Sequence, residues 1–171
     1  MDMAKKIEGD VAELDMLPDE MSLRNPVLVF LLGRGRMGKS TLGRYIGENA
    51  IRRSVPLLMC DADRTNKTIS AYFENVVRPK FEDDDSLREL LNDVLNEQVE
   101  RRFSAIFDLE GGDRILKEHA ESLGLVEFCQ QFDIDPVAVH FIGTTDEDLA
   151  YLESIETNQS FSPERTILVF P

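Results

Sequence analysis

The chain has 171 residues, of which 42% are hydrophobic and 30% are charged, a balance typical of one globular domain. Its 33 acidic residues against 19 basic ones leave a formal net charge of −14, which argues against direct DNA binding and against an anionic membrane surface as partner. The sequence contains no apolar run of membrane-spanning length, no signal-peptide pattern and no disulfide framework among its two cysteines. We therefore expect a cytoplasmic protein.

Predicted strands and helices alternate along the chain. A polar leader, partly helical from about Asp10, covers residues 1–24, and one domain covers residues 25–171. Continuous apolar runs predict strands buried on both faces, as in a parallel sheet. These runs are PVLVFLLG (26–33), VPLLMCDAD (55–63), RFSAIFD (102–108), PVAVHFIGTT (136–145) and RTILVFP (165–171). Helices are expected over 40–53, 82–102, from about 114, and over 146–156, the last capped by Thr145, whereas 68–77 fits a helix or an irregular loop.

The clearest helix, residues 82–102, has a capping-box pattern in Ser86 and Glu89. Its apolar residues follow the helical stripe i, i+3, i+4, i+7, i+8. They are Leu87, Leu90, Leu91, Val94 and Leu95. Acids at 82–85 suit the positive end of the helix dipole. The alternation of strands and helices predicts an α/β fold with a mostly parallel sheet.

The stretch LLGRGRMGKST (31–41) contains the spacing G-x-x-x-x-G-K-S between a predicted buried strand and a predicted amphipathic helix. In this setting the backbone amides of a glycine-rich turn and the helix N-terminus bind phosphate. The lysine is expected on the β- and γ-phosphates, the serine hydroxyl on Mg²⁺, and Thr41 on the α-phosphate. The predicted nucleotide-binding residues are Gly33, Arg34, Gly35, Arg36, Met37, Gly38, Lys39, Ser40 and Thr41.

Acidic residues follow the next two predicted strands. Asp61 and Asp63 end the second strand, and Asp108 ends the third in SAIFD, the pattern of a Walker-B acid that supports Mg²⁺. Ligands of open α/β sheets bind beyond the carboxyl ends of the strands. We therefore predict that these carboxylates lie beside the phosphate loop.

Three motifs resemble those of the ParA/MinD type of deviant Walker-A P-loop ATPase, and in particular its plasmid mobilisation and conjugal-transfer (TraL-like) members. GRGRMGKST is similar to the family's phosphate loop, DADRTNKT (61–68) to its D-x-D switch segment, and FDLEGGD (107–113) to its strand-end turn. The resemblance covers about residue 26 to the end. It implies a three-layer α/β/α fold, ATP and Mg²⁺ as ligands, and a nucleotide-bridged homodimer with a protein partner in transfer, mobilisation or partition.

The resemblance also implies roles for single residues. Lys39 and Ser40 bind phosphate and Mg²⁺, and Asp108 holds Mg²⁺ through water. Asp63 orients the attacking water and Asp61 supports the metal, although spacing alone leaves these two roles exchangeable. Gly111 lets its backbone approach the γ-phosphate.

Three positions depart from the family pattern. Arg34 replaces the signature lysine that reaches a partner subunit's phosphates; the alternatives are that Arg34 binds its own nucleotide or faces solvent. Arg36 replaces a glycine. Glu110 brings a second carboxylate to a position where it would repel the γ-phosphate, so we expect it to point away.

The other candidate residues indicate no further site. His119 and His140 are isolated, and Cys60 and Cys129 have no neighbouring histidine in the sequence, so we expect structural roles for all four. A run of cations is expected to serve phosphates and solvent. It comprises Arg34, Arg36, Lys39, Arg44, Arg52 and Arg53.

The favoured function is a slowly hydrolysing dimerisation-switch ATPase whose turnover a partner stimulates. The alternatives are a nucleotide-dependent recruitment module without hydrolysis and a small-molecule P-loop kinase. The chain stops on an apolar strand, so we expect a longer parent protein.

Overall fold

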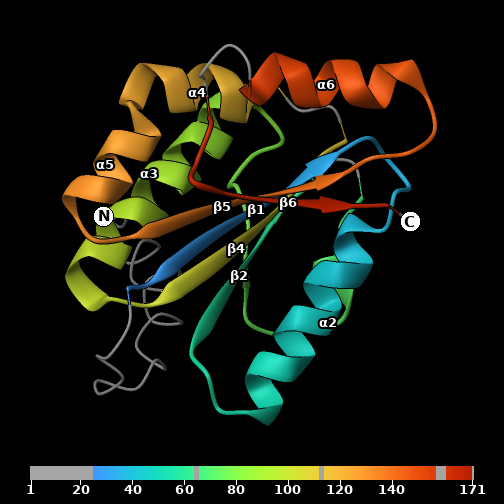
Figure 1. Cartoon of the computed structure of the whole chain (residues 1–171). Coiled ribbons are helices and arrows are strands. Elements are labelled where there is room, and N and C mark those ends of the chain that lie inside the picture. The colour runs from blue at the N-terminus through green and yellow to red at the C-terminus, as the bar shows by residue number, and fades with distance from the viewer. Residues whose placement is uncertain (1–24, 64–65, 112–113, 157–160, 171) are drawn as a thin grey trace.

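The computed structural model describes residues 25–63, 66–111, 114–156 and 161–170. Helices cover both faces of their central sheet (Figure 1). The strands are β1 (Val27–Gly33), β2 (Leu57–Ala62), β3 (Val76–Val77), β4 (Ser104–Leu109), β5 (Asp135–Phe141) and β6 (Arg165–Val169). The helices are α2 (Lys39–Arg52), the 3₁₀ turn η2 (Ile69–Ala71), α3 (Asp84–Arg101), α4 (Ile115–Leu123), α5 (Leu125–Gln131) and α6 (Asp146–Glu156).

The six-stranded sheet is parallel throughout, in the order β3-β2-β4-β1-β5-β6. β1, which leads into the phosphate loop, lies between β4 and β5. The carboxyl ends of parallel strands meet at one edge of the sheet, so the acids after β2 and β4 lie at the edge where the loop begins. The predicted three-layer α/β fold is confirmed.

Two hydrophobic cores lie on opposite faces of the sheet. The helices α3 to α6 cover one face, and α2 covers the other (Figure 1). In the first core the ring of Phe30 lies 5.3 Å from that of Phe107 and meets the edge of Phe161 at 5.0 Å. The predicted apolar stripe of α3 is buried in this core, as expected.

Helix α2 packs closely on the sheet because two of its inward positions are glycines. A Cβ at Gly43 would lie 2.8 Å from Ile69 Cδ1, and one at Gly47 would lie 2.8 Å from Phe73 Cζ. A side chain at either position would require the end of Ile69 or of Phe73 to shift, so the two glycines let α2 lie directly against these side chains. This packing fixes the position of the phosphate loop at the start of α2.

The structure corrects two local predictions. The N-cap of α3 is Asp83, whose carboxylate accepts the Ser86 backbone N–H at 2.8 Å, so Ser86 lies inside the first turn and is not the cap. The ambiguous segment 68–77 contains η2 and β3, and the two-residue strand β3 was not predicted because so short a strand has no periodicity. The leader, residues 1–24, lies outside the described residues.

Candidate nucleotide-binding site

The phosphate loop joins β1 to α2 through residues in left-handed backbone conformations. Gly33 has φ 132°, and a Cβ there would lie 2.7 Å from the carbonyl oxygen of Phe141. Gly38, the N-cap of α2, has φ 94°. Arg36 has φ 64°, which a residue with a side chain adopts at a cost of roughly 1 kcal/mol. Arg36 therefore occupies a backbone conformation that favours glycine, the residue that the resembled family usually has at this position.

The first turn of α2 presents backbone N–H groups to the loop, and it contains no acidic residue. Such a helix start favours an anion, because the N–H groups lack partners in their own helix and the helix dipole is positive there. The Lys39 side chain, 6% exposed, donates from Nζ to the carbonyl oxygens of Gly33 at 3.1 Å and Arg34 at 3.0 Å. The lysine thus lies along the inside of the loop.

Three carboxylates act on Lys39. Burial lowers the pKa of its ammonium group, and the negative charges of Asp108, Asp63 and Glu110 oppose that lowering. Asp63 also accepts the Asn66 backbone N–H at 2.7 Å. Glu110 is half-buried and its negative charge acts on Lys39, and the expectation that its side chain points away from the site stays a prediction.

Asp108 lies near the end of β4, opposite Leu31 of β1 and opposite Asp61 of β2 in the strand register, and is 1% exposed. Burial raises the pKa of its carboxyl to about 6; the Ser40 hydroxyl and the Lys39 charge oppose this rise. Neither carboxylate oxygen accepts a well-formed hydrogen bond from the part of the chain that the structure describes. Asp108 is therefore a buried acid whose charge is poorly compensated.

Asp61 is fully buried and has partners for one of its oxygens. Oδ2 accepts the Ser70 backbone N–H at 2.9 Å, the Ser70 hydroxyl at 2.6 Å and Arg78 Nη1 at 3.0 Å. The other oxygen, Oδ1, is buried and accepts no hydrogen bond from the described residues. The Asp61 carboxylate therefore links the segment that contains η2 to the end of β2. Its role as a metal support stays a prediction.

Gly111 lies against the phosphate loop. A Cβ at this position would overlap the backbone nitrogen of Gly35 and would lie 2.8 Å from its Cα. The turn after β4 thus contacts the loop directly, and any larger residue would displace one of the two segments. Gly111 was predicted to allow a close backbone approach, and the approach seen here is to the loop.

Arg34 is engaged within its own chain. Nη1 lies 2.7 Å from Glu147 Oε2 and 3.9 Å from Asp148 Oδ1, and it donates to the Thr145 hydroxyl at 3.2 Å. Asp148 Oδ2 accepts both the backbone N–H of Thr145 at 3.2 Å and its hydroxyl at 2.7 Å. The start of α6 is thereby connected to the phosphate loop. Arg34 is 47% exposed in this contact, in agreement with the solvent-facing alternative, and its role toward its own or a partner's nucleotide stays a prediction.

The donors near α2 suit Mg²⁺, which takes oxygen ligands from one or two protein groups and the rest from phosphates and water. The Ser40 hydroxyl interacts with Asp108, whose oxygens are buried without well-formed hydrogen bonds in the described chain. The same described residues contain no group of three or more His, Cys, Asp or Glu that could hold a metal by itself. The site therefore fits a magnesium ion that arrives with a nucleotide.

The structure brings the predicted loop residues, Asp108, Asp63 and Gly111 together at one edge of the sheet. Sequence reasoning missed Ser70 and Arg78 as partners of Asp61, and Glu147 and Asp148 as partners of Arg34. The predicted helix after Thr145 is confirmed as α6, and Asp148 accepts the backbone N–H of Thr145, as the acid of a capping box does. None of the described helices is long and apolar enough to cross a membrane.

Comparisons with known proteins give structural likenesses only. No family model matches the chain, and no curated protein sequence matches it. Chloroplast FtsY from Physcomitrella patens superposes with a TM-score of 0.55 at 16% identity, over 95% of this chain and 58% of that one. The signal recognition particle receptor FtsY from Elizabethkingia anophelis gives 0.57 at 14% identity, over 95% and 55%.

The chain thus spans 55–58% of the length of these FtsY chains. MinD from Aquifex aeolicus, a member of the family that the sequence motifs resemble, gives a TM-score of 0.35 at 13% identity, over 84% of this chain and 81% of that one. That value is too low to support the ParA/MinD assignment or its TraL-like branch. The likenesses to FtsY establish the fold, and this chain has the fold of a P-loop NTPase.

Proposed function

We propose that the chain is a magnesium-dependent nucleotide-binding switch that slowly hydrolyses a nucleoside triphosphate. The observation that carries this proposal is the cluster at the start of α2, where Lys39, Ser40 and the buried Asp108 interact. A buried acid with a raised pKa beside a phosphate loop is destabilising unless a cation joins it. Nucleotide with Mg²⁺ supplies that cation together with phosphates for the loop.

Binding requires one rearrangement of a side chain. Lys39 exchanges the carbonyl oxygens of Gly33 and Arg34 for the β- and γ-phosphate oxygens, while the first turn of α2 donates backbone N–H groups. Ser40 and Asp108 would hold the metal. Magnesium, when bound, neutralises charge on the β- and γ-phosphates.

Hydrolysis needs a group that orients water, and we assign this role to Asp63. Asp63 follows β2, and its negative charge raises the pKa of both Lys39 and Asp108. We assign Asp61 a structural role in holding the segment that contains η2, because its Oδ2 accepts hydrogen bonds from Ser70 and Arg78. These contacts of Asp61 support giving the water-orienting role to Asp63, a choice that spacing alone left open.

The proposed nucleotide is ATP, on the strength of the ParA/MinD resemblance. GTP is the alternative, since the FtsY of Elizabethkingia anophelis has been solved with GDP. A nucleotide-dependent homodimer in plasmid transfer, mobilisation or partition rests on the same sequence resemblance. In such a dimer Arg34 would have to exchange Glu147 for the partner's phosphates.

The test measures binding of ATP and GTP by calorimetry with Mg²⁺ and with EDTA, phosphate release over hours, and mass in solution. Lys39→Ala removes a charged hydrogen-bond donor, so affinity falls roughly 10- to 150-fold. Lys117→Ala on α4 is the matched control and leaves affinity unchanged. Asp63→Ala keeps binding and loses turnover. Binding that is equal in wild type and Lys39→Ala would refute the proposal.

A second function, nucleotide-dependent recruitment of a partner without hydrolysis, is favoured by one observation. The charge of Glu110 acts on Lys39, and a further carboxylate near the γ-phosphate opposes the charge that develops there. Glu110→Gln distinguishes the two functions. Turnover that appears only in Glu110→Gln supports recruitment, whereas turnover in the wild type supports the switch.

A further inference from the structure

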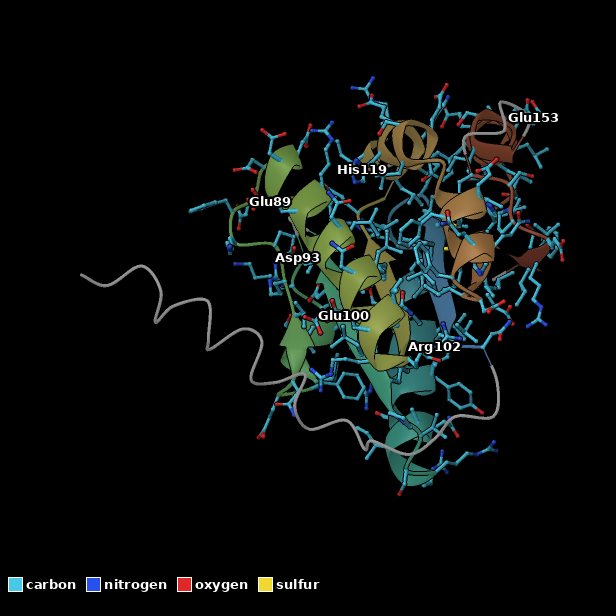
Figure 2. The ribbon with its side chains drawn as sticks, turned by 90° about the vertical axis from the view of Figure 1, so that its left-hand side faces the viewer. Glu89, Asp93, Glu100, Arg102, His119 and Glu153 are labelled. Carbon is cyan, nitrogen blue, oxygen red and sulfur yellow. The ribbon has the colours of Figure 1, made fainter. Side chains whose placement is uncertain are left out.

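The charges of the chain are strongly separated. Residues 34–80 contain ten Lys and Arg against four Asp and Glu, whereas the rest of the chain contains nine against 29. The first group belongs to the phosphate loop, α2, β2, η2 and β3, and acids dominate the helices on the opposite face of the sheet. Figure 2 shows Glu89, Asp93 and Glu100 along α3 on that opposite face. The net charge of −14 therefore conceals a cationic region around α2.

The outward side of α2 is cationic and also carries large apolar side chains. Arg44, Tyr45, Ile51 and Arg52 follow the helical spacing i, i+1, i+7, i+8, so they share one side, and the Arg44 guanidinium lies 4.0 Å from the ring centroid of Tyr72. Tyr45, Ile51 and Tyr72 are 62%, 68% and 55% exposed. We call these five residues the α2 face.

This mixture of groups favours a peptide as the occupant over a nucleic acid. A duplex backbone presents charge and sugar and gains little from an exposed Ile51 or from the exposed Val55 that follows α2. An amphipathic acidic segment uses both kinds of group, since its apolar side chains cover Tyr45 and Ile51 while its carboxylates meet the arginines. Glu48 already accepts from Arg44 at 2.6 Å, which shows that this guanidinium accommodates a carboxylate.

The chain itself contains such a segment. Residues 8–23, EGDVAELDMLPDEMSL, hold six acids and no basic residue. Val11, Leu14 and Leu17 recur at three-residue intervals, as on one side of a helix. We propose that residues 8–23 dock on the α2 face of the same molecule.

Chain topology gives the leader access to this face. Residue 25 precedes β1 at the edge of the sheet where the parallel strands begin. Helix α2 returns to that same edge, because it connects the end of β1 to the start of β2 (Figure 1). The α2 helix is about 21 Å long, and 16 residues span about 24 Å even as a helix. Attachment within one chain raises the effective concentration to the millimolar range, so weak contacts suffice.

The test uses the full chain, which contains no tryptophan. Leu17→Trp therefore introduces a single tryptophan on the apolar side of the leader, and this indole can be excited separately from the three tyrosines. Docking places it against Tyr45 and Ile51, and its emission is blue-shifted at low salt relative to a free indole. In 1 M salt, where the screening length is about 3 Å, the emission moves to the red.

Charge variants in this background locate the contact. Arg44→Glu with Arg52→Glu abolishes the blue shift, and adding Glu13→Lys with Asp15→Lys restores it. Arg101→Glu with Arg165→Glu makes the same change in formal charge away from α2 and leaves the emission unchanged. Circular dichroism checks that each variant is folded. If a charge-reversal variant does not fold, Arg44→Gln with Arg52→Gln takes its place, and this neutral pair gives a partial loss of the blue shift.

Three outcomes would overturn the inference. They are solvent-exposed emission of Leu17→Trp at low salt, an equal response to the control pair, and a blue shift that depends on protein concentration, which would place the leader on another molecule. None of them involves a nucleotide. The inference and the proposed nucleotide function therefore fail or hold independently.

Discussion

Asp61 and Asp108 lie opposite each other on β2 and β4, and both are almost fully buried. Asp61 Oδ2 accepts from Ser70 and forms an ion pair with Arg78. Asp108 accepts no well-formed hydrogen bond from the described residues, and burial raises the pKa of its carboxyl to about 6. A buried acid with partners holds the structure together, whereas a buried acid without them is kept at a cost that a bound cation can offset.

This difference predicts that one substitution has opposite effects at the two positions. Asp61→Asn leaves Arg78 without its counter-ion in a largely buried place, and the free energy of unfolding falls by about 1.5–3 kcal/mol. Urea unfolding of the nucleotide-free protein measures it. Arg78→Gln is the reciprocal control and gives a loss of similar size. An unchanged free energy in Asp61→Asn would mean that the ion pair does not hold the η2 segment.

Asp108→Asn has the opposite effect on the nucleotide-free protein. It removes a buried charge, so the free energy of unfolding rises by on the order of 1–2 kcal/mol at pH 7. The same variant loses Mg²⁺-dependent nucleotide binding, which calorimetry detects. A gain in stability with loss of binding identifies an acid retained for function. If Asp108→Asn destabilised the nucleotide-free protein, Asp108 would be a structural acid like Asp61.

The pH dependence of stability sharpens the comparison. The raised pKa of Asp108 means that the folded state holds this proton more tightly than the unfolded state does. Its stabilising contribution is fully present below about pH 3.8 and is lost as the pH rises through about 6. The advantage of Asp108→Asn over the wild type is therefore small at pH 4, grows as the pH rises toward 6, and reaches its full size at about pH 7, one unit above the folded-state pKa.

Unfolding at several pH values measures this window, and metal binding gives an independent check. Protonated Asp108 binds metal poorly, so Mg²⁺-dependent nucleotide affinity in the wild type falls as the pH drops below about 6. The charge of Asp61 also raises the pKa of Asp108. Asp61→Asn therefore shifts the midpoint to lower pH. A midpoint near the ordinary carboxyl value in the wild type would contradict the burial of Asp108.

These contrasts indicate how far the sequence determines the site. The phosphate loop and Asp108 were predictable because their signals are local: a fixed spacing, and an acid ending an apolar run. The partners of Asp61 were not, because Ser70 and Arg78 come from a segment without clear periodicity. Glu147 and Arg34 are 113 residues apart in the sequence. They come into contact because β1, which precedes Arg34, pairs with β5, which precedes α6.

The Arg34–Glu147 pair lies at the surface and provides the counterpart of the buried Asp61–Arg78 pair. Its side chains are 47% and 76% exposed, so solvent screens it, and such pairs contribute roughly 0.2–1 kcal/mol. Glu147→Gln should therefore leave the free energy of unfolding unchanged within about 0.5 kcal/mol. Because Arg34 lies in the phosphate loop, removing its competing carboxylate should tighten nucleotide binding by roughly 1.4- to 5-fold.

Calorimetry with the proposed nucleotide tests this, and the chain offers a matched control. Glu153→Gln makes the same change on α6 at an exposed position that Figure 2 labels, away from the loop, and leaves affinity unaltered. Arg34→Gln combined with Glu147→Gln removes the gain if the effect passes through Arg34. Weaker binding in Glu147→Gln would instead mean that Glu147 holds Arg34 in the position that the phosphates need. The exposed pair would then prepare the site for binding and would not compete with it.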